Sequence, residues 1–202
     1  QKVSNTSAFT ISAFYREFRD QIQVRKIVNA YPKDYTTYGN IDFGTTKGFT
    51  LDFDMRRTGN LTLKANYSMQ FAEGTGSDDR TQLNLINSNT PNFRSINPLN
   101  YDARHTINLN ASYSFGEGKD YNGPTVKNKQ ILSNFGINLQ LMARSGTPYT
   151  AQVNATPEGI EGQPGRPITD GSINGSRKPW YFRLNMRVWK DFTFRVGKKD
   201  AK

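Results

Sequence analysis

The segment Leu61-Thr62-Leu63-Lys64-Ala65-Asn66-Tyr67-Ser68-Met69-Gln70-Phe71 alternates strictly between apolar and polar residues. Every odd position in it is apolar and every even position is polar. Because successive side chains of a β-strand point to opposite faces, the segment predicts a strand with one apolar face and one polar face. A helix would instead spread residues i, i+2 and i+4 around its circumference, so the pattern argues against a helix.

The same two-residue period recurs along the chain. Alternating apolar residues occupy six segments: 9–15, 49–55, 61–71, 107–115, 135–143 and 180–188. The longest segments exceed the usual soluble strand of about 5–6 residues and match the roughly 9–11 residues of a tilted membrane-spanning strand. The sequence therefore predicts an all-β protein, a segment of a transmembrane antiparallel β-barrel with about six strands.

In a membrane barrel the polar face of each strand lines a wet lumen and the apolar face contacts lipid. The candidate lumen-facing residues are Lys64, Asn66, Gln70, Asn108, Asn110, Arg183 and Arg187. Aromatic residues near the strand ends stand where an interfacial girdle is expected: Phe71, Phe115, Trp180, Phe192 and Phe194. A soluble β-sandwich, in which the polar faces form the outer surface, is the alternative that the period alone leaves open.

The predicted connections alternate in length. They cover residues 19–39, 57–60, 73–103, 117–130 and 145–179, in the order long, tight, long, medium, long. Outer-membrane barrels have short periplasmic turns and long extracellular loops, so this order favours a barrel. Single-chain barrels have at least about eight strands, so six cannot close one. We therefore expect residues 1–202 to be part of a larger barrel domain, with assembly from several copies as the alternative.

The composition alone indicates a different class of protein. The formal net charge is +10 and only 35% of the 202 residues are hydrophobic, which is typical of a nucleic-acid binder. The basic residues concentrate in 177–202, where Arg183 and Arg187 alternate away from the apolar residues. A single-strand-binding sheet needs basic and aromatic side chains on the same face, so nucleic acid is not expected as a partner. In a lumen, paired arginines can tether a plug or hold an anionic substrate.

Catalytic and metal-binding patterns receive little support. His105 is the only histidine and cannot build a zinc site by itself, so it is interpreted as a hydrogen-bonded loop anchor. Asp78 and Asp79 lack the spacing of a calcium loop. Asp52 and Asp54 share a strand face and are interpreted as lumen charges. The sequence has no cysteine, no nucleophile elbow and no phosphate-binding loop, so neither an enzyme nor a cofactor is expected.

Several stretches resemble the C-terminal barrel of TonB-dependent outer-membrane receptors, in the branch found in Bacteroidetes-type bacteria. They are residues 15–22 (YREFRDQI), 39–44 (GNIDFG), 100–109 (NYDARHTINL), 145–150 (SGTPYT) and 183–192 (RLNMRVWKDF). The resemblance covers most of the chain and keeps the order of the family. It implies a 22-stranded barrel with an N-terminal plug, which imports a scarce nutrient such as a siderophore, an oligosaccharide or a peptide.

The same resemblance implies the partners. They are the lipid of the outer membrane, an inner-membrane TonB complex that the missing N-terminal part would contact, and an extracellular lipoprotein lid. The chain departs from the family pattern because it lacks a plug, an energy-coupling box and the closing strands. A barrel component of a secretion or surface-assembly complex is therefore kept as an alternative function, beside the soluble binding module.

Overall fold

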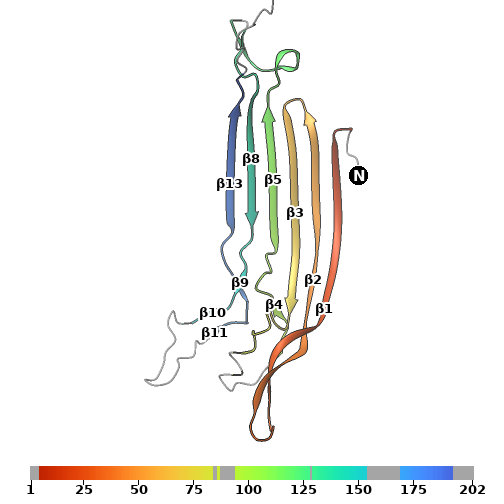
Figure 1. Cartoon of the computed structure of the whole chain (residues 1–202), viewed down its shortest axis with the longest axis vertical. Helices are drawn as coiled ribbons and strands as arrows, with labels where there is room; N and C mark the ends of the chain where they lie inside the picture. Colours follow the sequence, from red (N-terminus) through yellow and green to blue (C-terminus); the bar gives the residue numbers. More distant parts are fainter. Residues whose placement is uncertain (1–4, 84–85, 87–93, 128, 154–168, 193–202) are drawn as a thin grey trace, which may run out of the picture.

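The computed structural model describes residues 5–83, 86, 94–127, 129–153 and 169–192. Six long strands form one antiparallel sheet in the order β1-β2-β3-β5-β8-β13, and the short strand β4 (Asn97–Pro98) pairs with β3. Their bounds are Ser7–Ile27 (β1), Tyr35–Thr58 (β2), Leu61–Gly74 (β3), His105–Ser114 (β5), Phe135–Arg144 (β8) and Tyr181–Lys190 (β13). The six predicted strands are confirmed. The sheet is open in Figure 1, with β1 and β13 at its two edges.

Short strands and one 3-10 helix lie at the two ends of the sheet in the described residues. At one end lie the 3-10 helix η1 (Gly118–Asp120) and the ladder of β6 (Thr125–Val126) with β7 (Lys129–Gln130). At the other end β9 (Pro148–Tyr149) pairs with β12 (Ser176–Arg177), and β10 (Ala151–Gln152) pairs with β11 (Thr169–Asp170). None of the helices in the described residues is long and apolar enough to cross a membrane.

The connections alternate between the two ends of the sheet as predicted. Thr58 and Leu61 are joined by a tight turn in which Gly59 has a positive φ of 62°, a conformation that glycine adopts without steric cost. The connections from β3 to β5 and from β8 to β13 both lie at the opposite end, the long-loop end (Figure 1). The predicted placement of these two long connections at one end, opposite the tight turn, is therefore confirmed.

The first connection is much shorter than predicted. Residues 19–39 were expected to form a loop, but β1 continues to Ile27 and β2 begins at Tyr35, so that only residues 28–34 connect them. The register shifts near Asp20, which has a positive φ of 55°, and the paired strands then continue as a twisted ribbon beyond the sheet (Figure 1). Apart from Gln23, Val24 and Asp42 at its base, the ribbon has side chains that are exposed or partly exposed on both faces, so its sequence does not need the apolar alternation that marks the rest of each strand.

The apolar face of the sheet is exposed rather than packed into a core. Leu184 and Met186 of β13 are 66% and 68% exposed, and Ile11 of β1 is 65% exposed. The buried apolar side chains of the described residues are few and mostly small: Val24, Ala72, Leu99, Ala103 and Ala143. A soluble sandwich would cover its apolar faces with a second sheet, whereas a membrane barrel leaves them for lipid.

Candidate functional site: a polar groove along one face of the sheet

The polar side chains of neighbouring strands form continuous rows because the register brings them opposite one another. Asn66 of β3 faces Asp52 of β2 on one side and Asn108 of β5 on the other. Lys64 faces Asp54 and Asn110 in the next row. The alternation seen in the sequence therefore becomes a two-dimensional polar surface.

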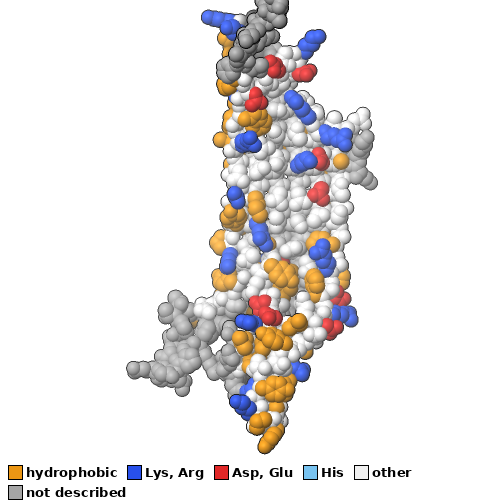
Figure 2. Space-filling view, viewed as in Figure 1, with side chains coloured by type: hydrophobic (Ala, Val, Ile, Leu, Met, Phe, Trp, Pro, Cys, Tyr) orange, Lys and Arg blue, Asp and Glu red, His pale blue; other side chains and the backbone are white. Residues whose placement is uncertain are grey.

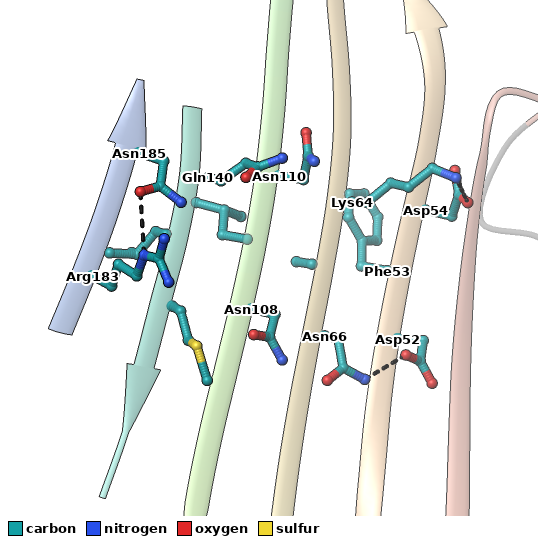
Figure 3. Close-up of a pocket in the computed structure, with 14 residues that line it drawn as sticks. Asp52, Phe53, Asp54, Lys64, Asn66, Asn108, Asn110, Gln140, Arg183 and Asn185 are labelled. Atoms are coloured by element: carbon teal, nitrogen blue, oxygen red, sulfur yellow. Dashed lines mark hydrogen bonds and ion pairs between the residues drawn. The ribbon is translucent and has the colours of Figure 1, made fainter. Parts of the chain in front are cut away.

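These rows line a groove of about 510 Å³ that crosses β2, β3, β5, β8 and β13 (Figure 3). Its polar and sulfur-containing side chains are Asp52, Asp54, Lys64, Asn66, Asn108, Asn110, Gln140, Met142, Arg183 and Asn185. Figure 2 shows this side of the molecule: much of it is white, with scattered basic and acidic side chains, and hydrophobic side chains gather mainly toward the long-loop end. The surface is thus suited to polar, hydrated molecules.

Hydrogen bonds hold the acidic end of the groove in place. The Asn66 amide donates to the Asp52 carboxylate at 2.6 Å, and the Lys64 ammonium lies 3.3 Å from the Asp54 carboxylate. The side chains of Lys64 and Asp54 are 66% and 53% exposed, so this ion pair contributes at most about 1 kcal/mol to stability. These contacts order the side chains and leave the polar surface open to solvent.

The opposite end of the groove is basic. Arg183 and Arg187 of β13 share the polar face with Arg144 of β8, which pairs one row further along. In the described part of the chain none of these three guanidiniums forms an ion pair with a carboxylate. The groove therefore runs from carboxylates on β2 to Arg183 on β13, and the other two arginines lie on the same face outside it.

The structure brings together most of the residues that the sequence singled out. Lys64, Asn66, Asn108, Asn110 and Arg183 line the central groove. Arg187 lines a second groove of about 580 Å³ beside Trp189 and Asp191. Gln70 lies in the same polar row of β3, opposite Gly48, and lines neither of these two grooves. All seven side chains thus belong to one face, and their exposure to a lumen remains a prediction.

His105 belongs to the apolar face and has the anchoring contacts expected of it. Its Nδ1 lies 2.8 Å from the Tyr67 hydroxyl, and its backbone N–H donates to the Ser145 hydroxyl at 3.0 Å. The imidazole also stacks on the rings of Tyr67 and Trp180, with centroids 6.1 and 5.8 Å away. His105 is therefore part of an aromatic row at the long-loop end.

The remaining acidic candidates have structural contacts. The Asp78 carboxylate accepts hydrogen bonds from the backbone N–H of Arg80 at 2.9 Å and from the Thr81 hydroxyl at 3.1 Å. Within the described ranges, no three His, Cys, Asp or Glu residues gather closely enough to hold a metal ion. Asp78 thus stabilises its own turn. Of the predicted aromatic residues, Phe194 lies outside the described residues.

Two buried carboxylates at the long-loop end were missed by sequence reasoning. Asp42 is 3% exposed; it accepts hydrogen bonds from the Gln23 amide at 2.7 Å and the Thr75 hydroxyl at 3.0 Å, and pairs with Arg94 at 2.7 Å. These contacts fasten the base of the β1–β2 ribbon to the loop between β3 and β5.

Asp102 plays the same role between the two longest loops. It is 1% exposed; its carboxylate accepts a hydrogen bond from the backbone N–H of Ala72 at 3.0 Å and forms an ion pair with Arg177 of β12. Arg177 also donates to the backbone carbonyl of Asp102 at 2.7 Å. In the sequence Asp102 is only an aspartate just before a predicted strand. Nothing in that position indicates that its partner is 75 residues away.

Comparison with known proteins gives one family and one structural likeness. The family described as "TonB dependent receptor-like, beta-barrel" matches residues 2–200. Among solved structures, the outer membrane transporter YddB from Escherichia coli is similar to this chain with 16% sequence identity and a TM-score of 0.48. The similarity covers 91% of this chain and 24% of that one, so the chain spans about a quarter of the transporter's length. No curated protein matches the chain in sequence.

Proposed function

Because this chain belongs to the TonB-dependent receptor-like β-barrel family, whose members lie in the outer membrane, we propose that it forms part of the wall of an outer-membrane importer. The apolar face of the sheet contacts lipid and the polar face lines the path of the solute. The protein moves a scarce nutrient and does not convert it chemically.

The observation that carries the proposal is the contrast between the two faces of the same strands. On β13, Leu184 and Met186 point to the exposed apolar face, while Arg183 and Asn185 line the polar groove. A continuous row of apolar side chains that are two-thirds exposed is unfavourable in water. In lipid they are favourable, and the polar residues on the other face then require a hydrated lumen.

The proposal extends to the partners of the whole protein. An inner-membrane TonB complex supplies the energy through a segment outside these 202 residues, and a plug fills the lumen. The unpaired arginines of the polar face are available to acidic groups of that plug or to an anionic part of the solute. An extracellular lipoprotein lid and a Bacteroidetes-type source remain predictions from the resemblance.

Membrane fractionation and uptake test the proposal together. The full-length protein is expected in the outer-membrane fraction, extracted only by detergent, with a mobility in SDS gels that changes on heating. Deleting its gene and inactivating TonB are expected to cause the same growth defect when the nutrient is scarce. Recovery of the native protein in the aqueous fraction would refute the membrane barrel, and import that persists without TonB would refute the energy coupling.

A further inference from the structure

A smaller cavity of about 240 Å³ lies between the two longest loops and shares no lining residue with the polar groove. One wall comes from residues 74–77, 81–82, 95 and 97–99, at the end of β3 and in the loop that follows it. The other wall includes Thr150, Ile173 and Asn174 of the loop that follows β8. Pockets for drug-sized ligands have volumes of about 300–1,000 Å³, so this cavity suits a single small ring.

Hydrogen bonds between the two loops and within each of them fix the walls of the cavity. The Asn174 amide donates to the backbone carbonyl of Pro98 at 2.7 Å and to the Asn100 side chain at 3.0 Å. The backbone N–H of Asn174 donates to the Thr150 hydroxyl, and that of Asn100 donates to the Ser77 hydroxyl, both at 3.0 Å. A cavity whose walls are already fixed lowers the entropic cost of ordering them around a ligand.

The chemistry of the lining is uncharged. None of the described residues that line the cavity is ionisable; hydroxyl and amide side chains alternate with the apolar surfaces of Pro98, Leu99 and Ile173. A charged group entering such a site would lose its hydration without gaining a counter-charge, so the lining selects against ions. A neutral molecule with both polar and apolar surface matches it.

The side-chain oxygen of one lining residue accepts no hydrogen bond from the residues that the structure describes. Gln82 is 4% exposed, and its amide N–H donates to the backbone carbonyl of Thr75 at 3.2 Å. Its Oε1 has no partner among the residues that the structure describes. Because buried acceptors are normally satisfied, this oxygen calls for a donor such as the hydroxyl of a ligand or a water molecule.

We propose that this cavity binds one neutral, polyhydroxylated ring of the size of a pyranose, as the first capture site for the imported nutrient. Ring hydroxyls both donate and accept hydrogen bonds, as the Ser, Thr, Asn and Gln side chains of the lining require. The C–H faces of the ring cover Leu99 and Ile173. This inference rests on the proposed transport function and assigns its substrate to the carbohydrates.

Saturation-transfer NMR on the detergent-solubilised full-length receptor tests the assignment. The neutral probes are the methyl pyranosides of glucose, galactose and mannose; glucuronate and N-acetylglycine amide represent the anionic and amide classes. At least one pyranoside is expected to give a signal that I173W weakens about tenfold, because the indole fills the cavity and excludes the ring. V153W is the matched control, because Val153 is in the same loop, 61% exposed and outside the cavity.

Three results would overturn the inference. They are no saturation-transfer signal from any of the three pyranosides, equal pyranoside signals in the wild type and I173W, or a signal from glucuronate or the amide that is stronger than those of the pyranosides. If I173W loses its heat-dependent gel mobility, I173A replaces it and is expected to weaken the signal about threefold through lost apolar contact. A receptor that fractionates with the outer membrane but binds no pyranoside would lose this inference alone. A receptor found in the aqueous fraction would lose the proposed function as well.

Discussion

Replacing Asp102 with alanine is expected to release the loop that follows β8 from the loop that follows β3. Besides a longer ion pair with Arg104 at 3.7 Å, the substitution removes two close charge-assisted interactions, one with the backbone N–H of Ala72 and one with Arg177. Hydrogen bonds to charged groups contribute about 1.5–3 kcal/mol each. The Arg177 side chain is 25% exposed and keeps its bond to the Asp102 carbonyl, so we take the lower value for both and expect a total of about 3 kcal/mol.

Hydrogen exchange of the full-length receptor measures this loss locally. A loss of about 3 kcal/mol corresponds to roughly 100-fold faster exchange, since each 1.4 kcal/mol is a factor of ten. The amides of Ala72 and of β12 are expected to accelerate by about that factor, while those at the centre of β5 remain unchanged. D102N keeps the acceptor for Ala72 and is expected to accelerate β12 only.

The matched control is D170A, which removes an exposed carboxylate on β11, in the loop that follows β8 and also contains Arg177. Exchange in D102A that stays within about threefold of the wild type would refute the claim that Asp102 joins the loops. Acceleration spread evenly over β5 and β8 would also contradict it, because that result would indicate destabilisation of the whole sheet.

Three further predictions concern the side chains of the sheet. L184R is expected to destabilise the receptor in lipid vesicles by up to about 2–4 kcal/mol in urea titrations, whereas N185R on the polar face has little effect; equal effects would contradict the assignment of faces. In G136A the new methyl group meets the Trp189 ring, which costs about 1–3 kcal/mol in the same titration. If contact with the Trp189 ring causes this destabilisation, G136A has no effect in a W189A background. If a change in the backbone causes it, the destabilisation persists there. K64A is expected to change stability by less than about 1 kcal/mol, because the ion pair that it removes is exposed, and a larger change would show that the pair is structural.

The sheet was predictable because one physical constraint acts on every second residue. Lipid on one side and water on the other impose an alternation such as that of residues 61–71, and this alternation together with the geometry of the turns limits the register. The same constraint explains the wrong prediction for residues 19–39. Most side chains of the β1–β2 ribbon are exposed or partly exposed on both faces, apart from a few at its base, so the alternation ceases although the strands continue.

The contacts between loops could not be predicted in the same way. Asp42 and Asp102 lie in polar stretches where an aspartate is unremarkable, and their burial depends on partners as distant as Arg94 and Arg177. The polar groove was accessible to sequence reasoning because its members repeat at a fixed period. The cavity between the loops was not, because its walls meet only through long-range hydrogen bonds such as that from Asn174 to Pro98.

A cysteine scan of β3 in the full-length receptor, in intact outer membranes, tests the central claim most directly. Single cysteines replace residues 62 to 69 in turn, in a sequence that has no cysteine of its own over these 202 residues. A charged, water-soluble maleimide is expected to label the even positions, including 64 and 66, and a lipid-soluble maleimide is expected to label the odd positions, including 63 and 65. Labelling by the charged reagent that shows no two-residue period, or that favours the odd positions, would contradict the account.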